Sequence, residues 1–387
     1  MEEAAYGVVA LFVLLFGLVS RKIEHSFLTG PMLYMTFGYL LNRLGLLTQG
    51  GHFLIVVVAH ITLILILFSD ASRIKLILFR KEYDLPRRLL GIGLPLTICL
   101  GTIIAYLLFP HIPIWQLAVL ATILAPTDAA LAQSVINSKK VPERIRSAIN
   151  VESGLNDGIC FPFLLMFLSL ADPSLPAKEH LYWVRFIGLQ LILGAVVGAG
   201  IGWGGGRLVK WSVQRGWMSD KFQKLSAVAL AFTAYCFADL SGGNGFIAVF
   251  IAGLFFGHEA RKVLRPIAHF EETEGELFVI LTFILFGAIL IPSAIQGFDG
   301  AIVLYALLSL TFVRMVPVAI SMIGKGLTRP MVLFLGWFGP RGAASILYML
   351  IVLVQYQLSE EQLIFQIATM TIILSVVLHG TSASRFE

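Results

Sequence analysis

The sequence predicts an all-α polytopic membrane protein, and three observations support that prediction. The 387-residue chain is 58% hydrophobic but only 13% charged, with a mean hydropathy of +0.87, whereas soluble domains carry about 25% charged residues. Apolar runs long enough to cross a bilayer recur along its whole length. The basic residues gather in alternate connections between these runs. Such a composition excludes a soluble domain, a nucleic-acid-binding module and a secreted disulfide scaffold.

The apolar runs divide the chain into thirteen predicted spans within one transmembrane domain, 1–387. Of the 28 Lys and Arg residues, 22 fall in the odd-numbered connections and the C-terminal tail, and only Lys178 falls in an even-numbered connection. Because cytoplasmic loops are enriched in basic residues, this asymmetry predicts an external N-terminus and a cytoplasmic C-terminus. The predicted spans are 4–19, 27–47, 52–69, 88–109, 113–137, 145–170, 181–202, 222–239, 243–257, 275–292, 300–323, 330–354 and 361–381.

Weaker patterns predict how some segments fold and pack. Gly194, Gly198 and Gly202 recur every four residues, a spacing that allows close helix packing within the chain or between subunits. Gly204-Gly205-Gly206 predicts a loop. The amphipathic stretch His258–Thr273 predicts a helix lying at the cytoplasmic interface.

Two spans carry helix-breaking residues at matching positions. Ala125-Pro126-Thr127 lies in the middle of the fifth span, and Gly339-Pro340-Arg341-Gly342 lies in the middle of the twelfth. The two prolines are 214 positions apart, and the twelfth span comes seven spans after the fifth. Because seven is an odd number, the two halves of the chain are predicted to be inverted in the membrane. Inverted repeats with broken helices are typical of secondary transporters whose site lies at the midplane. The alternative is that Pro and Gly are simply common in transmembrane helices.

Five ionisable residues fall inside predicted spans, where charge is costly and indicates function. They are Asp128, Glu152, Asp157, Arg314 and Arg341. At a rise of about 1.5 Å per residue, Glu152 and Arg314 lie at similar depths, about 10 and 13 Å from the cytoplasmic ends of their spans. An ion pair is the cheapest way to keep both charged. Such a pair is equally consistent with a clamp that only holds helices together.

The remaining two carboxylates, Asp128 and Asp157, either take up a proton or bind a cation. Oxygen atoms that suit a hard cation surround them in sequence: the Thr127 and Ser153 hydroxyls, and carbonyls released by the proline. Ser153 and Asp157 share a helix face, and Asn156 lies beside them. Gly154 and Gly158 are expected to admit a close neighbour. The alternative for a lone intramembrane Asp is a helix–helix hydrogen bond.

Several of these segments resemble the cation:proton antiporters, in particular the NhaP/NHE-like sodium/proton branch. The segments are 125–130, 139–146, 151–158, 246–254, 312–318 and 339–344, and the Glu-Ser-Gly-Leu-Asn-Asp run starting at Glu152 is the most specific. The resemblance covers nearly the whole chain. It implies an NhaA/NhaP-like fold of about thirteen helices, built from inverted repeats with crossed discontinuous helices.

The resemblance also implies roles for individual residues. Asp157 would alternately bind the cation and a proton, and Thr127, Asp128, Ser153 and Glu152 would complete the cation site. Arg314 would pair with Glu152, Arg341 would stabilise the crossed helices, and Asn156, in place of an Asp, would imply electroneutral one-for-one exchange. The chain reads Pro-Thr-Asp in the fifth span where many members read Thr-Asp-Pro. This departure weakens the expectation that Asp128 binds the cation directly.

In the implied architecture, an ion-binding core, 88–170 and 300–381, moves against a dimerisation part, 4–69 and 181–292. The expected protein is a homodimer in the plasma membrane that exchanges Na⁺, or Li⁺, for H⁺ in pH and sodium homeostasis. Its partners would be the cation, the proton and the lipid bilayer, with no cofactor and no nucleic acid.

Three alternatives remain open. A K⁺/H⁺ antiporter would have the same fold, because Na⁺ and K⁺ both take oxygen ligands. A cation channel would need a continuous pore or selectivity ring. An intramembrane enzyme is disfavoured, since Gly-x-Gly-Asp, His-Glu-x-x-His and Gly-x-Ser-x-Gly are all missing from the sequence. The eight histidines show no metal-ligand spacing and are expected to be structural.

Overall fold

The computed structural model describes residues 2–24, 28–46, 52–73, 84–128, 131, 138, 140–171, 180–260, 265–297 and 299–383. Within these ranges all regular elements are helices. In chain order they are α1 (Glu2–Glu24), α2 (Gly30–Arg43), α3 (His52–Arg73), α4 (Asp84–Arg88), the π-helical turn η3 (Leu89–Gly93), α5 (Leu94–Leu108), α6 (Ile114–Ile123), α8 (Glu143–Ala171), α9 (His180–Gln214), α10 (Asp220–Leu240), α11 (Gly245–Ala260), α12 (Arg265–Gln296), α13 (Gly300–Leu310), α14 (Phe312–Ser321), α15 (Arg329–Trp337), α16 (Ala343–Gln355) and α17 (Glu361–Ala383).

Each of the thirteen predicted spans has a helical counterpart. The fourth consists of α4, η3 and α5, the eleventh of α13 and α14, and the twelfth of α15 and α16. The fifth begins with α6, and most of its second half lies outside the described residues. Among those described, six stretches are long and apolar enough to cross a bilayer by themselves. They are Asp84–Leu108, Glu143–Ala171, Gly188–Gln214, Glu276–Gln296, Gly300–Ser321 and Glu361–Ala383.

The glycine-rich part of α9 differs from the sequence prediction. Gly204-Gly205-Gly206 lies inside a helix that continues to Gln214, so the predicted loop is wrong. A helix satisfies its own backbone hydrogen bonds, and this advantage in an apolar medium outweighs the poor helix propensity of glycine. Gly198 and Gly202 pack within the chain: a Cβ at either position would lie 2.3 Å from a carbonyl oxygen of α11.

The predicted interfacial helix over 258–273 is not a separate element. Its first three residues end α11, and residues from Arg265 onward begin α12, which runs without interruption to Gln296. Residues 261–264 lie outside the described part of the chain. The amphipathic pattern therefore marks where a long spanning helix starts.

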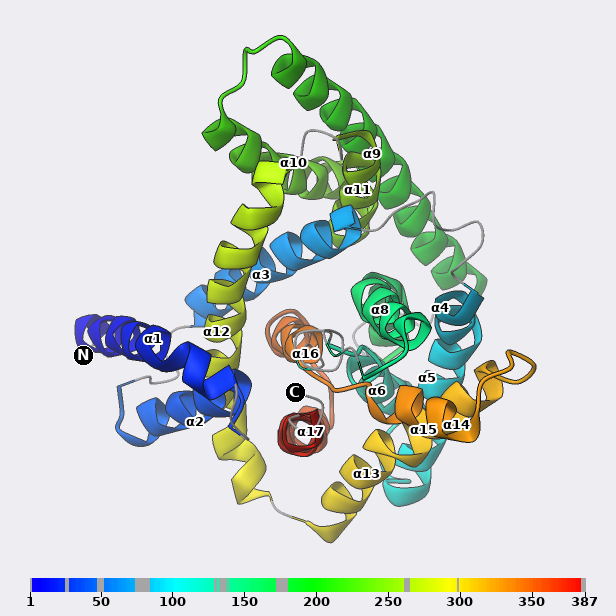
Figure 1. The fold of residues 1–387 in the computed structure, drawn as a ribbon. Coiled ribbons are helices and arrows are strands. Elements are labelled where there is room, and N and C mark those ends of the chain that lie inside the picture. The colour runs from blue at the N-terminus through cyan, green and yellow to red at the C-terminus, as the bar shows by residue number, and fades with distance from the viewer. Residues whose placement is uncertain are drawn as a thin grey trace.

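Two groups of helices are visible in Figure 1. Helices α1, α2, α3 and α9 to α12 form an arc in which α11 packs on α9 and α3, and α12 packs on α2. The arc surrounds one side of a cluster made of α4 to α6, α8 and α13 to α17. Contacts between the groups include α16 with α3, α12 with α17 and α11 with α8.

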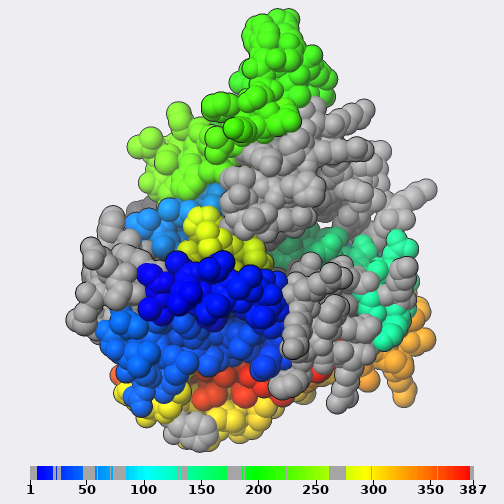
Figure 2. Space-filling model, turned by 60° about the vertical axis from the view of Figure 1, so that its left-hand side comes forward, coloured from blue at the N-terminus to red at the C-terminus, as the bar shows by residue number. Residues whose placement is uncertain are grey.

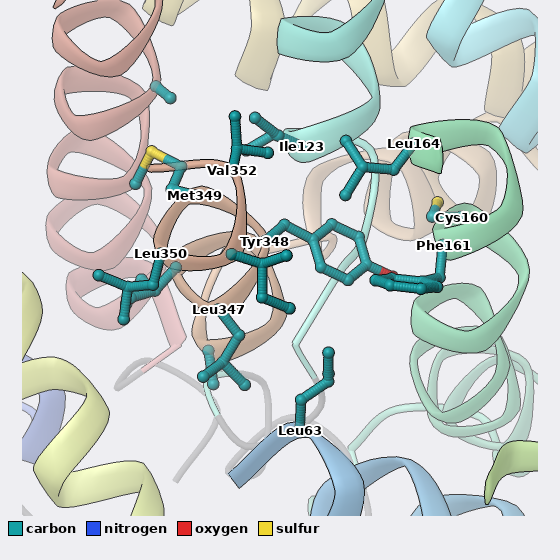
Figure 3. Close-up of a cluster of buried hydrophobic side chains, with 14 of the residues drawn as sticks. Leu63, Ile123, Cys160, Phe161, Leu164, Leu347, Tyr348, Met349, Leu350 and Val352 are labelled. Atoms are coloured by element: carbon teal, nitrogen blue, oxygen red, sulfur yellow. The ribbon is translucent and has the colours of Figure 1, made fainter. Parts of the chain in front are cut away.

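The centre of the molecule is apolar where α3, α6, α8 and α16 meet (Figure 3). Leu63, Ile123, Phe161 and Tyr348 are buried there, and the Phe161 and Tyr348 rings lie 5.6 Å apart between centroids. This packing fixes α8 and α16 relative to each other, and both helices carry residues of the candidate site.

The outer surface of the described part of the chain exposes many large apolar side chains. In Figure 2, α1 and α2 cover one face, and the junction of α9 and α10 projects beyond the rest of the molecule. Leu14 and Leu18 on α1, and Leu208 and Trp203 on α9, are exposed. Exposed apolar faces of this extent are expected where helices contact lipid.

Candidate functional site

Both predicted helix interruptions are present. Helix α6 ends at Ile123, and the chain is non-helical from Ala125 to Asp128. Helix α15 ends at Trp337, and α16 begins only at Ala343. Proline lacks an amide hydrogen and clashes with a continuing helix, which explains an interruption at each proline.

The two interrupted segments cross and bond to each other. The amide of Asp128 donates to the carbonyl oxygen of Pro340 at 2.8 Å. Arg341 is completely buried, and its Nη1 donates to the carbonyl oxygens of Ala125 and, at 3.3 Å, of Pro126. Those carbonyls lie just past the C-terminal end of α6, the negative end of the helix dipole. The Arg341 side chain thus compensates one helix end at the crossing.

Asp128 compensates the opposite helix end. Its Oδ2 accepts a hydrogen bond of 2.9 Å from the amide of Ala343, the first residue of α16. A carboxylate there is stabilised by the positive end of the helix dipole. Gly342 makes this approach possible, because a Cβ at that position would lie 2.0 Å from Asp128 Oδ2. Asp128 therefore caps the start of α16. The role of Asp128 as a direct cation ligand stays a prediction.

Glu152 and Arg314 form the ion pair that their similar depths predict. Arg314 Nη1 donates to Glu152 Oε1 at 2.6 Å and Nη2 donates to Oε2 at 2.8 Å, and both side chains are almost completely buried. Such two-point pairing is among the strongest polar contacts in proteins. The backbone of Gly339 lies against the guanidinium, and a Cβ there would be 2.6 Å from Arg314 Nε. The pair therefore ties α8 and α14 to the second break.

Oxygen-bearing side chains meet between α8 and the first break. Thr127 Oγ1 lies 3.0 Å from Ser153 Oγ, and Asn156 Nδ2 donates to Thr127 Oγ1 at 2.6 Å. All three residues are buried, as is Asp157, which lies one helical turn after Ser153. The Tyr348 hydroxyl donates to the backbone carbonyl of Asp157. This cluster joins the predicted residues Thr127, Ser153 and Asn156, and Asp157 follows Asn156 directly on α8.

One buried oxygen of this cluster lacks a hydrogen-bond donor among the described residues. Asn156 Oδ1 is buried and accepts no hydrogen bond from the part of the chain that the structure describes. A buried amide oxygen without a donor costs about 1–3 kcal/mol, so a bound cation or water would relieve it. Among the described residues, no group of three His, Cys, Asp or Glu side chains converges as a metal centre.

Gly158 and Gly154 differ, although the sequence gives both the same expectation. A Cβ on Gly158 would lie 2.5 Å from the Phe250 ring of α11, so this glycine does admit a close neighbour. Gly154 has no atom within 4 Å of the equivalent position, so the expectation for it is wrong. The four-residue spacing places both on one face, but α11 reaches that face only near Gly158.

Sequence reasoning missed several residues at the crossing. Ser375 and His379 on α17 contact both sides of the second break, and Tyr348 bonds to Asp157. The signal for Ser375 and His379 is visible in the sequence as two polar residues four apart within an apolar span. For Tyr348 no sequence signal exists, because its partner is a backbone carbonyl on a helix 191 positions away.

The fold and the site define a class of protein: an integral membrane transporter whose buried charges gather where two interrupted helices cross. The chain belongs to the sodium/hydrogen exchanger family, because the model of that family's transmembrane part matches residues 7–386. This family consists of transporters rather than enzymes.

Similar proteins support this assignment. The chain is 27% identical over 384 residues to the K(+)/H(+) antiporter NhaP of Alkalimonas amylolytica, covering 98% of this chain and 65% of that protein. It is 26% identical to the K(+)/H(+) antiporter NhaP2 of Shewanella baltica strain OS223, covering 84% of this chain and 56% of that protein. The chain thus spans between about half and two thirds of the length of these relatives.

A solved structure confirms the fold. The sodium proton antiporter MjNhaP1 from Methanocaldococcus jannaschii, at pH 8, superposes with a TM-score of 0.82 at 20% sequence identity, covering 100% of this chain and 98% of that one. The predicted NhaP-like fold is therefore present over the full length.

Proposed function

We propose that the chain exchanges one monovalent cation for one proton, with Asp157 holding each in turn. The observation that carries the proposal is the buried cluster of Thr127, Ser153 and Asn156 around the turn that precedes Asp157. Hydroxyl, amide and carboxylate oxygens are the ligands that hard cations take. The orphaned Asn156 Oδ1 supports a positive partner at this place.

The formal charges at the crossing support the one-for-one ratio. The three carboxylates of Asp128, Glu152 and Asp157 stand against the two guanidiniums of Arg314 and Arg341, which leaves one negative charge when all are ionised. Glu152 is matched by Arg314, and Asp128 and Arg341 each neutralise a helix end. One proton or one monovalent cation brings the sum to zero, so the two loaded forms carry the same charge.

Because both loaded forms have the same charge, the membrane potential does no net work on the exchange. Moving one elementary charge across 100 mV is worth about 2.3 kcal/mol, and here that contribution cancels between the half-cycles. The proton and the cation compete for the same carboxylate. The apparent affinity for the cation should therefore fall as the pH falls.

K⁺ is the first candidate for the cation. The two curated relatives described above are named K(+)/H(+) antiporters, whereas the sodium proton antiporter MjNhaP1 supports the fold alone at 20% identity. The Na⁺ preference that the sequence resemblance implies has weaker support, and Na⁺ and Li⁺ are retained as competitors in the test.

The moving parts are proposed as well. The crossing ties α6, α8, α14 and α16 together through buried polar contacts, which supports the core 88–170 and 300–381 as one moving body. The arc formed by α1, α2, α3 and α9 to α12 would then be the scaffold on which two copies dimerise. The distribution of Lys and Arg supports an external N-terminus and a cytoplasmic C-terminus.

The test is transport by the purified full chain in liposomes that contain a pH-sensitive dye. Adding K⁺, Na⁺ or Li⁺ outside should move protons outward, saturably, and K⁺ should act at the lowest concentration. Asp157→Asn should abolish the signal, and Gly154→Ala, which alters a position with no neighbour within 4 Å, should retain it. Wild-type exchange by Asp157→Asn, or cation flux without proton counterflow, would contradict the proposal.

A further inference from the structure

The second break repeats the layout of the first with opposite chemistry. At the first break, the residue after the proline, Thr127, contacts Ser153 on the following helix, α8. At the second break, the residue after the proline, Arg341, contacts Ser375 through its backbone amide at 2.7 Å; Ser375 lies on α17, which forms the span after the broken one. In both helices an ionisable residue follows the serine by four positions and shares its face: Asp157 in α8 and His379 in α17.

The two serine-containing turns present different atoms to the breaks. The turn in α8 offers hydroxyl and carboxylate oxygens, which suit a cation. The turn in α17 accepts a hydrogen bond from the backbone amide of Arg341 and ends in an imidazole, which is buried in the protein. Where the first break has the Thr127 hydroxyl and the Asp157 carboxylate, the second has the backbone amide of Arg341 and the imidazole of His379.

The His379 ring is fully occupied by protein groups. Its Nε2 lies 2.8 Å from the carbonyl oxygen of Trp337, which accepts from the ring when Nε2 carries a proton. Its Nδ1 lies 3.2 Å from Ser375 Oγ and 2.9 Å from the Ser375 carbonyl. The Ser375 hydroxyl accepts from Arg341 N–H, and a neutral imidazole donates to only one of its two carbonyl neighbours. One turn of α17 thus contacts both the amide of Arg341 and the carbonyl of Trp337.

These contacts hold the second break from both sides. Trp337 ends α15, and its carbonyl accepts from the amide of Gly339 at 2.8 Å within the break as well as contacting His379. Arg341 lies in the non-helical segment before α16, and its amide needs an acceptor. One turn of α17 therefore fixes both boundaries of the segment 338–342, which places the Arg341 side chain.

We propose that Ser375 and His379 are positioning residues that lock the second break, so that Arg341 reaches the Ala125 and Pro126 carbonyls. The second repeat thereby forms a closed counterpart of the cation site, in which protein donors stand where the first repeat takes up an ion. The lock concerns the structure of the segment 338–342 alone. Its effect on transport rests on the proposed function.

The first experiment measures the locking without transport. Hydrogen exchange of the segment 338–342 is followed by mass spectrometry in the purified full chain. Ser375→Ala removes the acceptor for Arg341 N–H, and exchange there should accelerate about tenfold. Ser375→Thr keeps the hydroxyl and should restore protection. The matched control is Thr381→Ala on the same helix, whose exposed hydroxyl bonds to the carbonyl oxygens of Val377 and Leu378, and it should change nothing at the break.

The second experiment measures cation exchange by variants of His379. His379→Leu removes both ring nitrogens, and His379→Gln keeps an N–H donor that can reach Trp337. Because Arg341 holds the carbonyls next to Thr127, His379→Leu should raise the KM for the cation about three- to tenfold with a smaller change in kcat. His379→Gln should recover most of that loss, and a general loss of stability would not produce this split between KM and kcat.

The outcomes separate the two proposals. Unchanged hydrogen exchange at 338–342 in Ser375→Ala would overturn the locking, whatever the transport result. If the wild-type chain shows no cation/proton exchange, the proposed function fails, while the hydrogen-exchange result still decides the locking. If His379→Leu does not fold, Ser375→Ala carries the test. Equal KM values in wild type and Ser375→Ala, with faster exchange at 338–342 in Ser375→Ala, would show that the lock does not act on the ion site and would overturn its positioning role.

Discussion

The two broken helices place opposite helix ends at the crossing, and this difference explains which charges gather there. At the first break, α6 presents carbonyl oxygens, and the Arg341 guanidinium meets them. At the second break, α16 presents amide groups, and the Asp128 carboxylate meets them. Each break therefore supplies the charge that the other one needs. A shift of one segment would expose buried helix ends on both, so the crossing is expected to move as a unit.

The same comparison separates ion-binding chemistry from structural chemistry. Next to the first break, α8 carries Ser153 and Asp157, and next to the second, α17 carries Ser375 and His379. One repeat keeps oxygen ligands beside the break, and the other fills the equivalent place with protein donors. On the proposed function, the cation site therefore lies at the first break, and the second break has a structural role.

The largest expected effect comes from the buried ion pair. Removing one partner leaves an uncompensated buried charge, at a cost of about 3–5 kcal/mol in soluble proteins. Glu152→Ala and Arg314→Ala should each lower the midpoint of thermal unfolding in detergent sharply, and the double variant should recover part of the loss. Losses that simply add would show that the two side chains do not interact.

The next effect is steric and tests how closely the breaks approach. Gly342→Ala places a Cβ 2.0 Å from Asp128 Oδ2, and overpacking of this kind costs about 1–3 kcal/mol. Gly154→Ala, a helical glycine with open space around it, should instead gain up to about 1 kcal/mol. The midpoints of thermal unfolding of the two variants measure this loss and this gain in stability. Similar stability in the two would contradict the close approach of Gly342 and Asp128.

A smaller effect is expected at the oxygen cluster. Thr127→Val keeps the shape of the side chain but removes the hydroxyl, which leaves Asn156 Nδ2 without its acceptor. A loss of about 1 kcal/mol should raise the KM for the cation about fivefold, and Thr127→Ser should keep the wild-type value. The dye assay in liposomes, run over a series of cation concentrations, gives the KM of each variant. An unchanged KM in Thr127→Val would remove the hydroxyl from the cation site.

The smallest effect is expected at an ion pair away from the crossing. Lys325 Nζ lies 2.5 Å from Asp84 Oδ2, and both side chains are partly exposed. Water already solvates such charges, so exposed pairs contribute little to stability. Lys325→Ala should leave the unfolding midpoint nearly unchanged, in contrast to Arg314→Ala. A loss as large as that of Arg314→Ala would mean that burial does not set the strength of these pairs.

The sequence predicts the fold and most of the site because both depend on strong local signals. Apolar length and the distribution of Lys and Arg define the segments, and the prolines at 126 and 340 define the breaks. The depths of Glu152 and Arg314 suffice to predict their pairing, since a buried charge must find a partner. Thr127, Ser153, Asn156 and Asp157 come together because two of them share a helix face and the break adjoins it.

The remaining contacts depend on tertiary geometry that no local pattern contains. The contact of Asp128 with Ala343 arises from how two segments 215 positions apart cross. Gly154 and Gly158 have the same spacing signal, yet only one meets α11. Gly204-Gly205-Gly206 stays helical because backbone groups in lipid have no alternative partner. In each case the neighbouring segments and the lipid determine the local structure, and the residue type alone does not.

The most direct test of the central claim is a null-point measurement of the exchange ratio. Liposomes containing the full chain are prepared with a cation gradient, and the opposing pH gradient at which no net proton movement occurs is found. One-for-one exchange at Asp157 predicts a null point where the cation and proton concentration ratios are equal, independent of an imposed membrane potential. A null point that shifts with the potential, or that lies at unequal ratios, would contradict exchange of one cation for one proton at a single carboxylate.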